Sequence, residues 1–242
     1  MRKTFPISPD ATHCSTCMLN SLCLPVGMSK QDIARLDEVV NARIRIAKGH
    51  PLFRLGEPTQ AIYGIRSGSI KTQLEDSAGQ LQITSFLLPG EIAGMDGLLE
   101  NRQLSHAIAL EDTEVCVIQV DQLDQLTYQF PALQLQVRRL MGKEIKRAHQ
   151  MVMSLGVLRS EQRLAAFLLN LSQRLSALGY SSTEFVLRMS REEIGNYLGL
   201  TLETVSRLFS RFARENLIRI QQREVQLLNM QALQELAGTD CG

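Results

Sequence analysis

Residues 191–208 have the sequence REEIGNYLGLTLETVSRL, which is typical of two short helices joined by a tight turn. Ser190, followed three residues later by Glu193, forms a capping box at the start of the first helix. Gly199 can adopt the left-handed conformation that ends this helix, and Thr201 is suited to cap the second helix. The pattern therefore predicts a helix-turn-helix, a motif that places its second helix in the major groove of DNA.

The apolar residues of this stretch fit the same motif. Ile194 and Leu198 lie on one face of the first helix, and Val205 and Leu208 of the second helix are placed to pack against them. Gly195 leaves room for the second helix to approach closely. We therefore expect these side chains to form the core of a small DNA-binding domain.

Three polar residues near the start of the second helix are predicted to face DNA. Arg207 can form a bidentate pair with guanine, and Glu203 can accept a hydrogen bond from cytosine N4. Ser206 can bond a base or a phosphate. The alternative is that all three are ordinary solvated residues of a surface helix. We expect double-stranded DNA to be the partner, since the residues around them fit the motif.

Composition sets limits on the class of protein. The 242 residues are 44% hydrophobic, which is enough for a real core. No stretch approaches 18 apolar residues and no apolar stretch follows the N-terminus, so we expect a cytoplasmic protein without a membrane segment. The net charge of +1 does not itself indicate nucleic acid. The four histidines are scattered and no phosphate loop or nucleophile elbow is present, so no enzymatic activity is predicted.

The chain is predicted to have an α+β organisation with four parts. A Cys-rich leader covers residues 1–30, a β-sandwich or barrel residues 31–130, a long helix residues 131–158 and a DNA-binding domain residues 159–242. Short alternating or β-branched runs between turn signals predict the strands of the second part, at residues 43–46, 62–65, 81–84 and 115–118. Residues 217–220 and 225–228 predict a small hairpin near the end of the chain.

The long helix has an apolar stripe. Apolar residues recur in steps of three and four, and basic residues lie on the opposite face. The apolar residues are Val137, Met141, Ile145, Ala148, Val152 and Leu155. The helix could pack on its own sandwich or form a seam between two subunits. Its length favours the second interpretation, so we predict a homodimer.

Cysteines are concentrated in the leader. Cys14, Cys17 and Cys23 have the spacing C-x2-C-x5-C, and Cys116 lies in a predicted strand. Three thiolates on a loop and a fourth from the domain body suit an iron–sulfur cluster, although structural zinc and redox thiols remain open from the residues alone. Cys241 lies at the frayed C-terminus and His13 is more typical of a surface residue, so neither is predicted as a ligand.

These motifs together resemble the FNR-type oxygen-sensing branch of the CRP/FNR transcription regulators, over nearly the whole chain. The stretches that carry the resemblance are the cysteines with His13, the run RLAAFL at residues 163–168, and residues 189–207. The resemblance implies a cyclic-nucleotide-binding-like β-sandwich (jelly roll), a long dimerisation helix and a winged helix-turn-helix.

The same resemblance implies a mechanism. A [4Fe-4S] cluster on Cys14, Cys17, Cys23 and Cys116 would promote dimerisation at low oxygen. The dimer would bind palindromic TTGAT-like sites through Glu203, Ser206 and Arg207, and would contact RNA polymerase. The alternative is a regulator of the same family that uses structural zinc or redox thiols to sense another signal.

Two positions depart from the patterns that are familiar in this branch, and one pair differs from the branches that bind cyclic nucleotides. Met18 replaces a serine beside the second cysteine, which changes the polarity there. Ala148 replaces an acidic residue in the dimer helix, which predicts a dimer less dependent on its cluster. Branches that bind cyclic nucleotides have a Gly-Glu followed by an Arg-Ser pair that takes the phosphate. This chain has Gly90-Glu91 but Leu104-Ser105 at the pair, so no cyclic nucleotide is expected.

Overall fold

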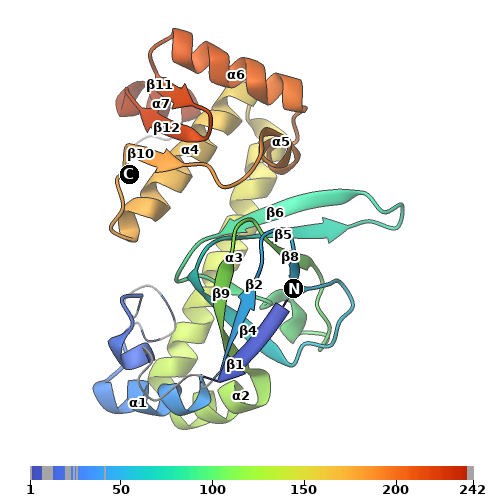
Figure 1. Cartoon of the computed structure of the whole chain (residues 1–242), viewed down its shortest axis with the longest axis vertical. Coiled ribbons are helices and arrows are strands. Elements are labelled where there is room, and N and C mark those ends of the chain that lie inside the picture. The colour runs from blue at the N-terminus through green and yellow to red at the C-terminus, as the bar shows by residue number, and fades with distance from the viewer. Residues whose placement is uncertain are drawn as a thin grey trace. The chain divides into compact units, whose positions relative to one another are not determined.

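The computed structural model describes residues 2–6, 13–19, 23, 25, 27–40 and 42–238, with only the backbone given for residues 2–6, 38 and 39 (Figure 1). Cys241, predicted to be a bystander, lies outside these residues. The chain divides into two compact units, Met1–Arg147 and Ala148–Gly242. The long helix runs from the first unit into the second.

The first unit contains two antiparallel sheets (Figure 1). One has five strands in the order β1-β2-β9-β4-β7, and the other has four in the order β3-β8-β5-β6. The strands are β1 (Arg2–Pro6), β2 (Ala42–Ile46), β3 (Pro51–Phe53), β4 (Ala61–Ser67), β5 (Ile70–Glu75), β6 (Leu81–Leu87), β7 (Ile92–Ala93), β8 (His106–Ala109) and β9 (Thr113–Gln119). The strands predicted at residues 43–46, 62–65, 81–84 and 115–118 are confirmed as parts of β2, β4, β6 and β9.

Residues from both sheets form one buried core, which makes this unit a sandwich rather than a barrel. Ile44 and Val115 of the larger sheet lie in the same apolar cluster as Phe53 and Ile70 of the smaller sheet. Alternation along β9 sends Val115 and Val117 into this cluster, while Cys116 and Ile118 belong to a second cluster. Cys116 therefore lies outside the sandwich core.

The second cluster joins the larger sheet to three helices. These are α1 (Lys30–Val39), α2 (Val120–Gln129) and α3 (Pro131–Val157). Leu36 of α1, Leu123 of α2 and Leu133 of α3 are buried in it together with Ile118 of β9. The helices thus cover the face of the sheet that carries Cys116.

The strand β1 and the helix α1 are among the elements of the first unit that were not predicted from the sequence. The leader was expected to contain no strand, but β1 pairs with β2 from Arg2 opposite Ile46 to Pro6 opposite Ala42. Such a short strand depends on its partner, so its own sequence carries little signal. The segment predicted as strands from residue 31 begins instead with α1, which Ser29 caps by accepting a hydrogen bond from the Asp32 amide at 3.2 Å.

The second unit contains the predicted hairpin and more than was predicted around it. Its elements are α4 (Ser160–Ala177), β10 (Glu184–Val186), α5 (Arg191–Leu198), α6 (Leu202–Arg214), β11 (Ile218–Gln221), β12 (Glu224–Leu227) and α7 (Met230–Ala237). The hairpin is β11 and β12, and β10 adds a third strand beside β12. The chain was expected to finish in the hairpin, but α7 follows it, capped by the Asn229 side chain at 3.0 Å from the Ala232 amide.

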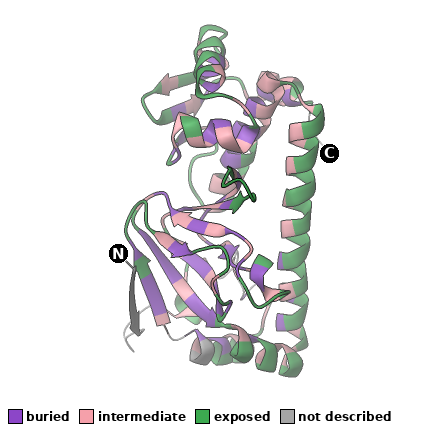
Figure 2. Ribbon diagram, turned by 90° about the vertical axis from the view of Figure 1, so that its right-hand side faces the viewer, coloured by how far each residue is buried: buried purple, intermediate pink, exposed green. Residues whose placement is uncertain are grey.

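The predicted helix at residues 131–158 is confirmed as α3, and Figure 2 shows much of its length exposed. Met141, Ile145 and Val152 of the predicted seam are exposed within the single chain, as is Ala148. Val137 is half-buried against the second cluster, and Leu155 packs beside Gly199. No helix in the described part of the chain, α3 included, is long and apolar enough to cross a membrane.

Gly195 provides a test of the turn between α5 and α6. A Cβ added there would lie 2.7 Å from the Leu200 carbonyl oxygen. We expect Gly195→Ala to lower the free energy of unfolding of this unit by about 1–3 kcal/mol in a denaturant titration. Gly156→Ala is the control, because a Cβ at Gly156 meets nothing within 4 Å and should stabilise the helix by up to about 1 kcal/mol. Equal unfolding midpoints for the two variants would contradict this account of the turn.

Candidate DNA-binding surface and cysteine site

The predicted caps of the helix-turn-helix are present. The Ser190 amide donates to Glu193 Oε2 at 2.7 Å, and the Glu193 amide donates to Ser190 Oγ at 3.1 Å. Gly199 has a φ of 63° at the end of α5, and Thr201 Oγ1 accepts from the Thr204 amide at 3.2 Å. Local sequence therefore determines where both helices begin and where the first one ends.

Buried contacts hold the motif together. The side chains predicted to be its core are all buried: Ile194, Leu198, Val205 and Leu208. Arg163 of α4 donates to the carbonyls of Leu198 at 2.9 Å and Leu155 at 2.8 Å. Arg163 thus satisfies carbonyls at the ends of α5 and α3, a role that the sequence alone did not indicate.

The exposed face of α6 carries the predicted DNA-contacting residues. Glu203, Ser206 and Arg207 are exposed near the start of the helix. The pKa of Glu203 lies below its ordinary value because its own backbone amide and the Thr201 side chain donate to the carboxylate, with a further contribution from Arg207. Glu203 is therefore an ionised hydrogen-bond acceptor at neutral pH.

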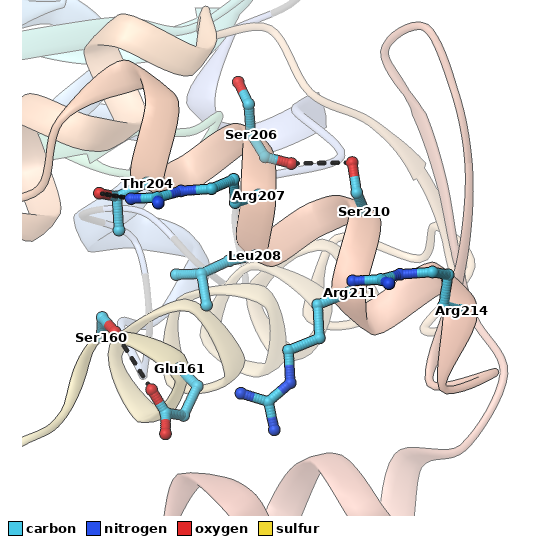
Figure 3. Close-up of a pocket in the computed structure, with 9 residues that line it drawn as sticks. All are labelled: Ser160, Glu161, Thr204, Ser206, Arg207, Leu208, Ser210, Arg211 and Arg214. Carbon is cyan, nitrogen blue, oxygen red and sulfur yellow. Dashed lines mark hydrogen bonds between the residues drawn. The ribbon is translucent and has the colours of Figure 1, made fainter.

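A groove of about 520 Å³ lies between the start of α4 and α6 (Figure 3). It is lined by Ser160, Glu161, Thr204, Ser206, Arg207, Leu208, Ser210, Arg211 and Arg214. Arg207 donates to Thr204 Oγ1 at 3.3 Å, and Arg211 pairs with Glu215 at 2.8 Å. Three arginines and four hydroxyl groups along this surface suit contacts with phosphates.

Arg191 supports the same surface from α5. Its guanidinium lies 3.3 Å from the centroid of the Phe209 ring on α6, a cation–π contact between the two helices. Burial lowers the pKa of Arg191 to about 10, so the side chain remains a cation at neutral pH. The sequence pattern did not single out this residue.

The four predicted cysteine ligands come together in the first unit. Cys14 begins a short 3-10 helix (Cys14–Thr16), Cys17 follows it, and Cys23 lies farther along the leader. Cys14, Cys23 and Cys116 pack against the second cluster, and no disulfide links the four. Gly64 lies opposite Cys116 in the sheet, and a Cβ there would be 3.6 Å from Cys23 Sγ and 3.9 Å from Cys116 Cβ.

The thiols influence one another electrostatically. Burial raises the pKa of Cys14 far above its ordinary value, and neighbouring Cys23, Cys116 and Cys17 raise it further. Burial also raises the pKa of Cys116, and Cys17 adds to the shift while the Arg43 guanidinium opposes it. Four thiolates cannot share this site unless a positive centre compensates for their charge.

Two charged residues that the sequence did not single out hold the site in place. Asp37 of α1 accepts hydrogen bonds from the amides of Cys14 at 2.5 Å and Ser15 at 3.4 Å. Arg43 is buried, lies opposite Cys116 in the sheet, and pairs with Glu114 at 3.5 Å. The leader is thus fixed to α1, and a cation lies beside the cysteine of β9.

Among the described side chains, no group of three His, Cys, Asp or Glu residues is arranged to hold a single metal ion. The mutual pKa effects of the cysteines nevertheless indicate that the four thiols lie near one another. His13 is half-buried, and within the described part of the chain its buried Nδ1 has no hydrogen-bond partner.

Comparisons with known proteins agree with both halves of this description. Residues 43–129 match the family described as cyclic nucleotide-binding domain, and residues 162–236 match the Crp-like helix-turn-helix domain. The chain is 62% identical over 240 residues to the transcriptional regulatory protein btr of Bordetella pertussis, covering 99% of each chain. It is 43% identical to the anaerobic regulatory protein of Pasteurella multocida, covering 95% of this chain and 84% of the relative.

The chain belongs to the CRP/FNR family of transcription regulators, in its FNR-type branch. A solved relative, FixK2 from Bradyrhizobium japonicum, is 28% identical and covers 82% of this chain and 98% of its own, with a TM-score of 0.75. The predicted α+β fold with a cyclic-nucleotide-binding-like sandwich and a C-terminal helix-turn-helix is confirmed. As in its relatives, the helix-turn-helix makes this chain a DNA-binding transcription regulator.

Proposed function

We propose that this FNR-type regulator responds to oxygen through a [4Fe-4S] cluster held by Cys14, Cys17, Cys23 and Cys116. The observation that carries the proposal is the convergence of three leader cysteines and one cysteine of β9 on the same face of the larger sheet. Iron–sulfur clusters of this type take four cysteine thiolates. The name of the Pasteurella relative, an anaerobic regulator, supports a link to low oxygen.

The residues present fit such a cluster. Gly64 has no side chain beside Cys23 and Cys116, and four thiols are the donor set that such a cluster takes. A bound cluster would supply iron–thiolate bonds that cross-link the leader to β9 and an oxygen-sensitive inorganic core. The alternative function is a regulator of the same family with structural zinc or redox thiols, which senses another signal.

The chain transmits the signal through contacts around this site. Asp37 holds the Cys14 turn against α1, and Leu133 and Leu140 of α3 are buried in the cluster of residues that the cysteines join. When the leader loosens, this packing weakens. A tenfold change in dimerisation requires only about 1.4 kcal/mol of coupling, which is less than the packing of one buried leucine.

The dimer is proposed to form along α3 through Val137, Met141, Ile145, Ala148, Val152 and Leu155. The exposed apolar residues at the centre of this stripe support a second copy as the partner. A dimer would place two copies of α6 about 34 Å apart, one turn of DNA. Glu203, Ser206 and Arg207 would then contact a palindrome with TTGAT-like half-sites, and RNA polymerase would be recruited by the bound dimer.

Cyclic nucleotides are not expected to be the signal. Glu91 pairs with Arg147 of α3 and accepts a hydrogen bond from the Leu88 amide at 2.9 Å. Ser105 donates to Asp96 at 2.7 Å, and the residue before it is Leu104 rather than an arginine. Glu91 and Ser105, which could meet a ribose phosphate, thus bind the chain's own residues instead. The arginine that would pair with the phosphate is replaced by Leu104.

Replacing one ligand tests the cluster. Cys23→Ala should abolish oxygen-sensitive DNA binding, because three thiolates leave one iron without its ligand. DNA affinity is measured by fluorescence anisotropy with and without oxygen at fixed salt. Cys241→Ala is the control and should behave as the unaltered protein. A Cys23→Ala protein that keeps full oxygen-sensitive binding would contradict the ligand assignment.

Replacing Arg207 tests base recognition. Arg207→Ala should lose about 1–3 kcal/mol of discrimination at the guanine of the half-site, because a bidentate contact is removed. Binding is measured against a panel of half-sites with each base at that position. Arg214→Ala is the control and should weaken all sites by a similar factor, as expected for a phosphate contact. An Arg207→Ala protein with unchanged preference for guanine would contradict the assignment.

A further inference from the structure

One polar side chain lies on the face of α3 that packs towards the cysteines. The buried residues of this helix are Leu133, Gln136 and Leu140. The two leucines belong to the cluster that Cys14, Cys23 and Cys116 join. Gln136 is only 2% exposed, so an amide group is buried between the leucines and next to the cysteine site.

Gln136 contacts the leader directly. Its Nε2 donates a hydrogen bond to the Cys23 carbonyl oxygen at 3.3 Å, joining residues that are 113 positions apart. Its Oε1 is buried and has no hydrogen-bond partner among the residues that the structure describes. One end of the amide therefore holds the segment that carries the third cysteine, while the other end is unsatisfied.

Packing alone does not account for glutamine at this position. A buried amide with an unpaired oxygen costs free energy that a leucine of similar size would avoid. The single bond to Cys23 offsets only part of this cost. The polar contact therefore points to a role in positioning the leader rather than in stabilising the core.

The same helix carries the exposed seam. Met141 and Ile145 are exposed within the chain, and Met141 follows Gln136 by little more than one turn. A shift of α3 or of its packing at Gln136 would therefore reach the seam through a rigid helix. No other element needs to move.

We propose that Gln136 is a positioning residue that fastens the Cys23 segment to α3 and so couples the cysteine site to the dimer helix. The coupling rests on the proposed function, whereas the fastening of Cys23 does not require a bound cluster. The two steps can therefore be tested separately.

The first test uses the cluster-free protein under anaerobic, reducing conditions. The rate of iodoacetamide alkylation at Cys23 is measured by mass spectrometry for the unaltered chain, Gln136→Leu and Gln136→Asn. Both variants should raise the Cys23 rate about fivefold, since each loses the hydrogen bond to the Cys23 carbonyl oxygen, which is worth about 1 kcal/mol. Gln134→Leu, at an exposed position of the same helix, should leave the rate unchanged.

Hydrogen exchange of the β4 and β9 amides shows whether the whole unit has loosened. The proposal expects unchanged exchange in these strands while Cys23 becomes more reactive. Unchanged Cys23 reactivity in both variants would overturn the proposal. Faster exchange in β4 and β9 in proportion to the Cys23 rate would also overturn it, because Gln136 would then support the whole unit.

The second test measures coupling. The dimer dissociation constants of iron-loaded and iron-free protein are compared by analytical ultracentrifugation. The ratio of the two constants should fall towards one in Gln136→Leu and remain unchanged in Gln134→Leu. If the ratio of the two dissociation constants in Gln136→Leu equals that of the unaltered chain, the coupling is overturned. If the unaltered chain takes up no iron, both the proposed function and the coupling fail. The alkylation experiment still decides whether Gln136 fastens Cys23 to α3.

Discussion

The convergence of four cysteine thiols in one partly buried site is the feature on which the proposed regulation by the first unit depends. Three cysteines of the leader, Cys14, Cys17 and Cys23, lie near Cys116 of β9. Burial and mutual repulsion disfavour their thiolates, as the raised pKa values of Cys14 and Cys116 indicate. A bound positive centre would convert this repulsion into attachment, and the attachment would be lost with that centre.

The surrounding fold connects the attachment of the leader to the helices that cover the larger sheet. Strand alternation turns Cys116 away from the sandwich core and towards α1, α2 and α3. Asp37 and Gln136 then hold the leader to two of those helices. The DNA-binding unit, by contrast, has its own caps, its own core and the Arg163 contacts, so its local structure does not require the cysteine site. This separation suits a regulator in which the signal changes the association of two subunits rather than the fold of the DNA-binding unit.

The sequence predicted those features that depend on neighbouring residues. The caps at Ser190, Gly199 and Thr201 are local, and strands such as residues 43–46 show clear alternation, so both were predicted correctly. The strand β1 and the helix α7 are short and depend on tertiary partners, and neither was predicted. The ligand set followed from the leader spacing and the family resemblance, since Cys116 alone has the pattern of an ordinary small core residue.

The supporting residues of both sites could not be predicted for a different reason. Asp37, Gln136 and Arg163 act through hydrogen bonds to backbone atoms of residues distant in the sequence, and Arg43 meets Cys116 only across the sheet. Backbone donors and acceptors occur along the whole chain, so no motif or spacing marks which one a side chain will meet. Such contacts become visible only when the fold is known.

The most direct test of the central claim is anaerobic purification followed by iron and sulfide analysis and a visible spectrum, repeated after exposure to air. The account predicts a brown protein with about four iron and four sulfide ions per chain, as one [4Fe-4S] cluster requires, that bleaches in air. A colourless protein that contains zinc or no metal would contradict the oxygen-sensing mechanism, while the assignment to a DNA-binding family would stand.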